Sequence, residues 1–330
     1  MDREAFFHAV SSPESDCYTH NGASRPRISD AINAASSRQH DTLNRLILDR
    51  IPLALPPTAS EPLAYGRGIA AFAQIYFAFE HAWQDLIDSL EHPDASDNDS
   101  RESQLRRRLA TLRPRGLARS ERFRQDLAYL SRRTGVDLES DRHIQQRIFR
   151  KVRRSVSKKP HTLVAFAWVM YMALFSGGRV IRHHLSRAGA QFWQERRDGS
   201  MDDAGSVEEP RGPRKSIPGF SFLYFDDGKD GNELKSIFKS RLAELETLLS
   251  DREREDVVQT AVGLFDECIA LVGMLDRESG VTFRRRPPSR TWITAGLLVA
   301  LSVMGFVAYH GIPNLDDLGW PAFRTRWRWR

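Results

Sequence analysis

LVAFAWVMYMALFSGGRVI, at residues 163–181, is an apolar stretch in which large side chains recur every three or four residues. This spacing places them on one face of a helix, so the stretch predicts a helix with one buried stripe. Three further stretches have the same periodicity, and the sequence contains no comparable alternation typical of strands. The sequence therefore predicts an all-α, multi-helical domain. The four stripes are Leu163, Phe166, Met170 and Ala173; Ile69, Phe72, Tyr76, Phe79, Trp83 and Leu86; Phe238, Leu242, Leu245 and Leu249; and Val258, Ala261, Phe265, Ile269 and Val272.

Two adjacent glycines, Gly177 and Gly178, follow Ser176 inside this apolar stretch. Glycine costs about 1 kcal/mol per residue in a helix interior, so a pair of them needs a reason. One reason is a close approach of the backbone to a flat ligand, with a local kink. A tight helix crossing or the end of a helix explains the pair equally well, so the glycines alone leave these alternatives open.

The composition is that of a folded protein from a reducing compartment. With 330 residues, 41% of them hydrophobic, the chain can bury one sizeable core or two smaller ones. Its two cysteines, Cys17 and Cys268, lack any metal-ligand spacing, which argues against a disulfide framework and a structural zinc site. The first residues lack the basic and long apolar regions of a secretory signal, so we expect the amino terminus to stay in the cytosol.

The chain divides into five segments by composition. Residues 1–25 have the character of a flexible arm, and residues 26–279 contain the helical patterns. Within them, two stretches rich in turn-forming residues, 91–103 and 198–216, are expected to be exposed loops. Residues 280–291 form a basic, proline-containing hinge. A charge-free span and a short tail, residues 310–330, follow the hinge.

The charge-free span, residues 292–309, predicts a transmembrane helix. Its 18 residues would cover roughly 27 Å, near the thickness of an endoplasmic reticulum bilayer, and aromatic residues stand at both ends. Arginines just before it favour a domain that faces the cytosol, which is tail-anchor geometry. Arginines in the tail weaken this charge asymmetry. The alternative to a transmembrane helix is a buried helix of a soluble protein. The arginines before the span are Arg284, Arg285, Arg286 and Arg290.

Basic residues are concentrated in the middle of a chain whose net charge is +6 and whose pI is about 9.5. A solvated helix face is the simplest interpretation. Docking onto an anionic membrane or an acidic electron-transfer partner is an alternative. Nucleic acid is disfavoured because no stacking aromatics are interleaved and no recognition motif is present. The residues are Arg106, Arg107, Arg108, Arg113, Arg115, Arg119, Arg122, Arg124, Arg150, Lys151, Arg153 and Arg154.

Several blocks, in order along residues 32–275, resemble the haem oxygenase family. The distal-helix signature is matched by 160-PHTLVAFA-167, continuing through Tyr171 to Ser176-Gly177-Gly178. The aromatic loop and the basic helix of the family are matched by 219-GFSFLYF-225 and 234-LKSIFKSRL-242. The remaining blocks are 37-SRQHDTLN-44, 73-AQIYFAFE-80 and 125-QDLAY-129. The resemblance is closest to the fungal branch, where a tail anchor is also expected.

The resemblance implies a site and a reaction. Haem would lie between a proximal helix bearing His40, the axial ligand of the iron, and a distal helix kinked at Gly177 and Gly178. Lys235 and Lys239, one helical turn apart, would pair with the haem propionates. The family consumes O2 and electrons that NADPH supplies through NADPH–cytochrome P450 reductase, and releases biliverdin, CO and iron. Haem is then both substrate and cofactor. Tyr171 and Phe265 complete the expected haem contacts, although an aromatic residue on an apolar stripe also fits the core.

The pattern departs from the family at the distal helix. Family enzymes carry an aspartate that orders distal water and helps to deliver a proton, whereas this chain has Leu174, which can neither donate nor accept a hydrogen bond. Another group such as Ser176 would then have to organise the water. Ala173 replaces the family's glycine, Met170 its arginine and Trp168 its propionate-contacting tyrosine.

Three functions therefore stay open at the level of sequence. The leading one is a haem oxygenase on the cytosolic face of the endoplasmic reticulum membrane. The second is a haem-binding or peroxidase-like protein on the same fold that does not degrade haem, because Leu174 stands at the aspartate position. The third is a tail-anchored adaptor without haem. The mitochondrial outer membrane is an alternative location.

Overall fold

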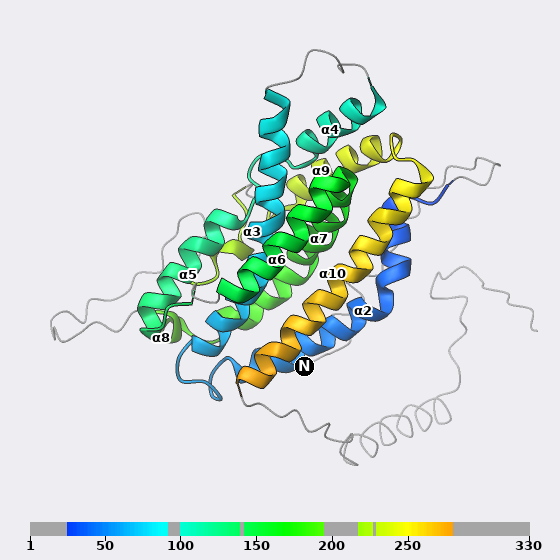
Figure 1. The fold of residues 1–330 in the computed structure, drawn as a ribbon. Helices are drawn as coiled ribbons and strands as arrows, with labels where there is room; N and C mark the ends of the chain where they lie inside the picture. Colours follow the sequence, from blue (N-terminus) through cyan, green and yellow to red (C-terminus); the bar gives the residue numbers. More distant parts are fainter. Residues whose placement is uncertain (1–24, 92–99, 139–141, 195–216, 227–228, 280–330) are drawn as a thin grey trace, which may run out of the picture. The chain divides into compact units, whose positions relative to one another are not determined.

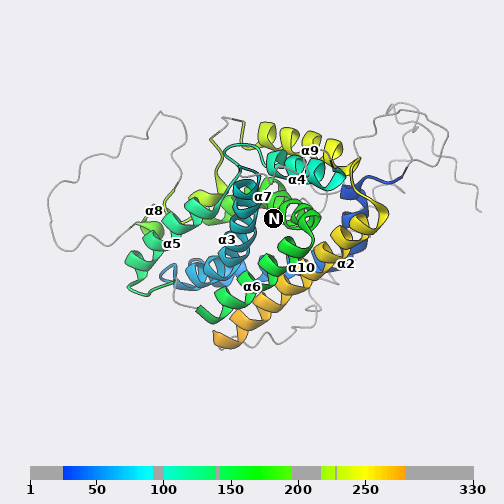
Figure 2. The same cartoon turned by 45° about the horizontal axis from the view of Figure 1, so that its top comes forward.

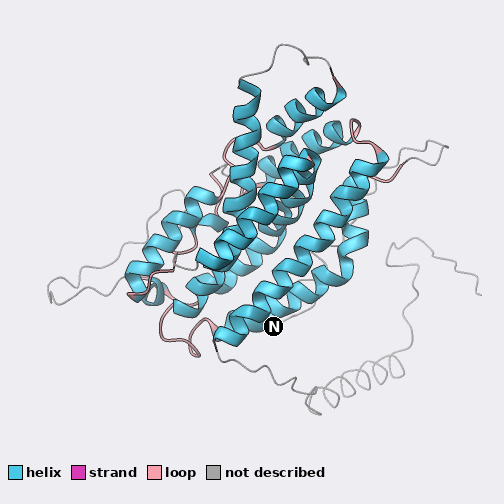
Figure 3. Ribbon diagram, in the orientation of Figure 1, coloured by secondary structure: helices cyan, strands magenta, loops and turns pink. Residues whose placement is uncertain are grey.

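The computed structural model describes residues 25–91, 100–138, 142–194, 217–226 and 229–279. All of them belong to one compact unit, and every regular element in this part of the chain is helical (Figures 1 and 3). The predicted all-α class is therefore confirmed. The elements are α2 (Ile28–Arg50), η1 (Ile51–Leu53), α3 (Leu63–Glu91), α4 (Arg101–Leu112), α5 (Ser120–Thr134), α6 (Arg142–Lys158), η2 (Pro160–Thr162), α7 (Leu163–Ser186), α8 (Ala190–Trp193), η3 (Ser221–Leu223), α9 (Asn232–Glu246) and α10 (Asp251–Glu278).

Helix α7 is the buried centre of the domain. Every residue from Leu163 to Tyr171 is buried. Helix α10 lies along α2 and also contacts α7, while α3 packs against α5 and α6, and α4 packs against α9 (Figures 1 and 2). The four apolar stripes lie on α7, α3, α9 and α10, except that Leu249 follows the end of α9, and they supply much of the core. Ala173 is the exception, because it lies on an exposed part of α7.

Local sequence signals set several helix ends. Ser250 begins α10 with a capping box, in which its hydroxyl accepts from the Glu253 amide and the Glu253 side chain accepts from the Ser250 amide. Gly135 ends α5 in a left-handed conformation, at φ 70°. Ser100 accepts a hydrogen bond from the Ser103 amide and begins α4. Residues 101–103, expected to be loop, are therefore the first turn of a helix.

Helix α7 continues through both glycines to Ser186, so they do not mark a helix end. Together with η2, α7 is long and apolar enough to cross a membrane, and so is α10, by length and composition alone. Both are helices of the domain core described here. Outside the described residues lie the predicted span 292–309, the hinge 280–291, the tail 310–330, the whole predicted loop 198–216 and all but the last residue of the predicted arm 1–25.

Candidate functional site

His40 lies on α2, where the ring of Phe265 from α10 meets it edge-on. The two ring centroids are 5.8 Å apart and the ring planes make an angle of 83°. The side-chain nitrogen Nδ2 of Asn44, one turn later on α2, is 3.3 Å from Nδ1 and 3.2 Å from Nε2 of the imidazole. The Asp41 carboxylate is 3.6 Å from Nδ1. With 35% of its side chain exposed, the imidazole is held from one side and open on another.

The distal helix opens to the surface just past its buried half. Ala173 is exposed, and Ser176 and Gly177 are half-buried. These positions are three and four residues apart, so the small residues share one face of α7. A Cβ added at Gly177 would meet no atom within 4 Å, which leaves open space beside the backbone. The Ser176 hydroxyl has no hydrogen-bond partner anywhere in the described part of the chain.

The two glycines differ in their surroundings. Gly178 is buried, and a Cβ there would stand 3.4 Å from Cδ2 of Leu223, which belongs to η3. Gly178 therefore lets the loop around η3 pack closely against α7. Gly177 has no such neighbour, so helix packing gives no reason for a glycine at that position.

Three of the four residues at which the sequence departs from the resemblance are buried, and Ala173 is exposed. Leu174 and Met170 are each 5% exposed and Trp168 is 7% exposed. The indole Nε1 of Trp168 donates to Oδ1 of Asn33 at 3.1 Å. Asn33 lies on α2 seven residues before His40, so this hydrogen bond connects the helix of His40 to the helix of the glycines.

Lys235 and Lys239 lie on α9. Lys235 is half-buried and Lys239 is exposed. Between them, Phe238 is fully buried and stacks on Trp168 at 6.4 Å between ring centroids. This contact fixes α9 against α7. Lys239 forms no ion pair with any side chain in the described segments.

Tyr171 is completely buried, and its hydroxyl donates to Oε1 of Glu80 at 2.8 Å. The pKa of Tyr171 is raised, first by burial and then by the charge of Glu80. Glu80 is itself 5% exposed and accepts from the Arg119 amide at 2.8 Å and from the Ser120 hydroxyl at 2.6 Å. Four donors around one buried carboxylate, the fourth being the Ser120 amide, explain how a charge is tolerated in the core.

The interpretation of the basic run as a solvated helix face is wrong for Arg119, because the side chain of Arg119 is fully buried. Its guanidinium donates to the carbonyls of Tyr224 at 3.2 Å and Gly116 at 3.1 Å, and lies 4.4 Å from the ring centroid of Phe225. Burial, followed by repulsion from Arg122, lowers the pKa of Arg119 to about 10.

Sequence reasoning did not single out this buried network. In the sequence, Glu80 is one residue of a predicted helix, and Arg119 is one member of an arginine-rich run. The same holds for Asp126, which is 2% exposed and accepts from the amides of Gly219 at 3.0 Å and Phe222 at 2.8 Å. Burial raises the pKa of Asp126, and these hydrogen bonds oppose that shift. For Glu80 the sequence contains one signal, a charged residue on the apolar helix α3. Asp126 lies on the charge-rich helix α5 and Arg119 directly precedes it, so neither stands out in the sequence.

The structure brings together some of the predicted residues. His40 and Phe265 are in contact, and Leu174, Ser176, Gly177 and Gly178 follow one another on α7. Tyr171 lies deeper on the same helix with its hydroxyl bound to Glu80. No group of three or more His, Cys, Asp or Glu side chains that could hold a metal occurs within the described ranges. His40 therefore stands there as a single imidazole.

Comparisons with known proteins agree with one another. The family model "Heme oxygenase" matches residues 27–273. The heme-binding protein HMX1 of Saccharomyces cerevisiae is 22% identical over 265 residues, which cover 76% of each chain. The heme-free heme oxygenase 2 of Chlamydomonas reinhardtii has a TM-score of 0.54 at 18% identity, covering 75% of this chain and 97% of its own. The heme oxygenase-2 of the cyanobacterium Synechocystis, solved with heme and NO, has a TM-score of 0.53 at 14% identity, covering 78% and 88%.

Proposed function

Because the chain belongs to the heme oxygenase family, we propose that it binds haem through His40 and cleaves it to biliverdin, CO and iron. The reaction uses O2 and electrons that NADPH supplies through NADPH–cytochrome P450 reductase. The observation that carries the proposal is the partly exposed imidazole of His40, which Phe265 and Asn44 contact. The hydrogen bond from Trp168 to Asn33 connects its helix, α2, to α7.

The residues present fit haem by the chemistry of the donor set. An imidazole is the usual proximal ligand of haem iron, and His40 supplies one that belongs to no metal-binding cluster within the described residues. Two lysines on α9 supply cations for two propionates, and Lys239 has no competing carboxylate in the described residues. The open space beside Gly177 suits a flat ring that approaches a helix backbone. When bound, haem supplies both the iron that activates O2 and the carbon that is oxidised.

The protein side chains hold and enclose the substrate. Phe265 packs against the edge of the His40 ring and restricts its rotation, and Asn44 contacts the ring nitrogens. Leu174 and Met170 make the distal helix apolar where the family has hydrogen-bonding groups. The Ser176 hydroxyl, two residues after Leu174, is the hydrogen-bonding side chain on the open face of α7. We assign it the role of holding distal water and passing on a proton.

A second candidate function is haem binding without degradation, and Leu174 favours it. A buried leucine can order no water, so proton delivery would depend on another group such as Ser176. The yeast relative is named as a heme-binding protein, which fits either candidate.

Haem turnover separates the two candidates. The full-length protein is loaded with haem, NADPH and reductase are added, and the visible spectrum is followed. In an oxygenase the Soret band decays while a biliverdin band grows, and Ser176→Ala slows this decay without weakening haem binding. If native protein is inactive but Leu174→Asp forms biliverdin, the protein is a binder that lacks the proton-delivering group.

We further propose that residues 292–309 anchor the protein in the endoplasmic reticulum membrane with residues 26–279 in the cytosol. The charge-free length of the span and the arginines before it support this topology. Fractionated cells test it. Resistance to carbonate extraction and digestion of the domain by protease added to intact microsomes are expected, and protection of the domain from protease would contradict the orientation.

A further inference from the structure

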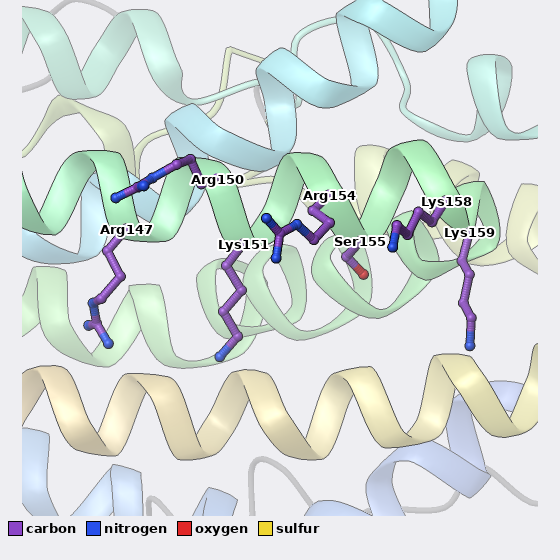
Figure 4. Close-up of a pocket in the computed structure, with 7 residues that line it drawn as sticks. All are labelled: Arg147, Arg150, Lys151, Arg154, Ser155, Lys158 and Lys159. Carbon is purple, nitrogen blue, oxygen red and sulfur yellow. The ribbon is translucent and has the colours of Figure 1, made fainter.

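Helix α6 carries a cationic face that the proposed haem site does not use. A cavity of about 520 Å³ along this helix is lined by six basic residues and one serine, all from α6 and the turn after it (Figure 4). They are Arg147, Arg150, Lys151, Arg154, Ser155, Lys158 and Lys159. All six basic residues are exposed.

The six basic residues that line this cavity fall into two stripes with different surroundings. Arg147 and Lys151 point toward α10 and pair with the two carboxylate oxygens of Glu267, at 2.7 and 2.8 Å (Figure 4). Lys159 pairs with Asp256 of the same helix at 2.6 Å. These pairs fix α6 beside α10 in antiparallel order.

The second stripe consists of Arg150, Arg154 and Lys158, spaced four residues apart and therefore on one face. Arg150 donates only to the backbone carbonyl of Gln146, at 3.2 Å. The side chains of Arg154 and Lys158 have no hydrogen-bond or ion-pair partner among the residues that the structure describes. The carboxylates facing α6 from its neighbours, Glu267 and Asp256 of α10 and Asp85 of α3, are already paired with other cations.

We propose that this stripe, Arg150, Arg154 and Lys158, docks onto the headgroups of an anionic lipid surface. Because like charges along one helix repel, an uncompensated row is costly unless an anionic partner offsets it. A lipid surface fits this stripe because three cations along one exposed helix face can contact the headgroups of a flat bilayer at the same time. The proposal rests on the membrane anchor at residues 292–309, which would keep the domain near the bilayer.

The position of α6 in the chain favours a membrane over an acidic protein. Arg147 lies beside Glu267, so α6 begins next to the carboxyl-terminal half of α10, from which the chain continues toward the expected anchor. Thirteen residues, 279–291, separate α10 from that anchor, and extended they span at most about 47 Å. Helix α6 itself is only about 26 Å long, so this tether lets its whole face reach the bilayer.

Acetylation footprinting of the full chain in lipid nanodiscs tests the proposal. Discs of phosphatidylcholine are compared with discs that also contain phosphatidylserine, and the acetylation rate of Lys158 is read by mass spectrometry. Each basic residue near an anionic leaflet strengthens the attraction by about fivefold, so we expect at least about fivefold slower acetylation in the phosphatidylserine discs. Lys229, an exposed residue in the turn before α9, is the internal reference, and its acetylation rate should be the same in both kinds of disc.

Two matched variants complete the test. Arg150→Glu/Arg154→Glu should abolish the protection of Lys158, whereas Arg67→Glu/Arg115→Glu, with the same change in charge at exposed positions elsewhere, should retain it. High salt should remove the protection as well. Equal rates of Lys158 acetylation in both kinds of disc would overturn the proposal, as would equal loss of protection in both variants.

A different partner would give a different pattern. If the lipid has no effect but Arg150→Glu/Arg154→Glu weakens turnover supported by the reductase, the face binds an acidic protein and the lipid proposal is wrong. Retention of the chain on phosphatidylcholine discs tests the anchor, and haem turnover tests the proposed reaction. The anchor and the haem reaction can therefore each be disproved independently of the proposed docking of α6 onto lipid.

Discussion

Replacing Gly177 by alanine should stabilise the protein without haem and weaken its binding of haem. Helix α7 continues nine residues beyond Gly177, so the position is a helix interior. An added Cβ meets no atom within 4 Å, so no clash offsets the gain in helix propensity. That gain is about 1 kcal/mol, which raises the Tm of a domain of this size by roughly 2–4 °C.

The same methyl group occupies the space where we place the haem. Forcing one methyl into a close contact costs about 1–3 kcal/mol, which corresponds to a roughly 5- to 150-fold increase in Kd. Thermal unfolding of the haem-free protein gives the first quantity and a Soret titration gives the second. Stability and affinity should therefore change in opposite directions.

Gly68→Ala is the matched control, because Gly68 lies inside α3 and a Cβ there also meets no atom within 4 Å. It should raise the Tm by a similar amount and leave the Kd for haem unchanged. A Gly177→Ala protein that binds haem as tightly as the native chain would refute the assignment of this face of α7 to haem.

Further variants test other parts of the structure. His40→Ala should remove the imidazole-ligated haem spectrum, and an unchanged ferric spectrum would exclude His40 as the ligand. Tyr171→Phe leaves the buried Glu80 carboxylate without one donor and should lower the free energy of unfolding by about 2 kcal/mol in urea titrations. Burial acts to raise the pKa of Glu253, but hydrogen bonds from Arg101 and Ser250 outweigh it and lower that pKa to about 2. A lowered carboxylate pKa adds stability above its unfolded value that is lost as the pH falls toward 2, so Glu253→Gln should flatten the acid limb of stability against pH.

The helical architecture could be predicted from periodicity, because buried stripes at helical spacing have few other solutions. Phe238, Leu242 and Leu245 on α9, and Leu249 just after it, are all buried as expected. Ala173 differs because small size, unlike a large apolar side chain, does not require burial. Its exposure is informative, since it widens the open face that includes Gly177.

The buried polar network could not be predicted in the same way. Whether Arg119 faces water or the core depends on what α3, the loop around η3 and Phe225 place around it, and these segments are distant in sequence. Likewise, only the fold shows that Gly178 accommodates Leu223 while Gly177 faces open space. The pairing of His40 with Phe265 also depends on the packing of α10 along α2.

Biliverdin formation by the native full-length protein tests the central proposal most directly. Haem-loaded protein is incubated with NADPH, O2 and cytochrome P450 reductase, and biliverdin and CO are quantified against the haem consumed. We predict that the Soret band disappears and that one biliverdin and one CO form per haem, in spite of Leu174. A Soret band that shifts on reduction but persists, without biliverdin or CO, would contradict the proposed oxygenase reaction.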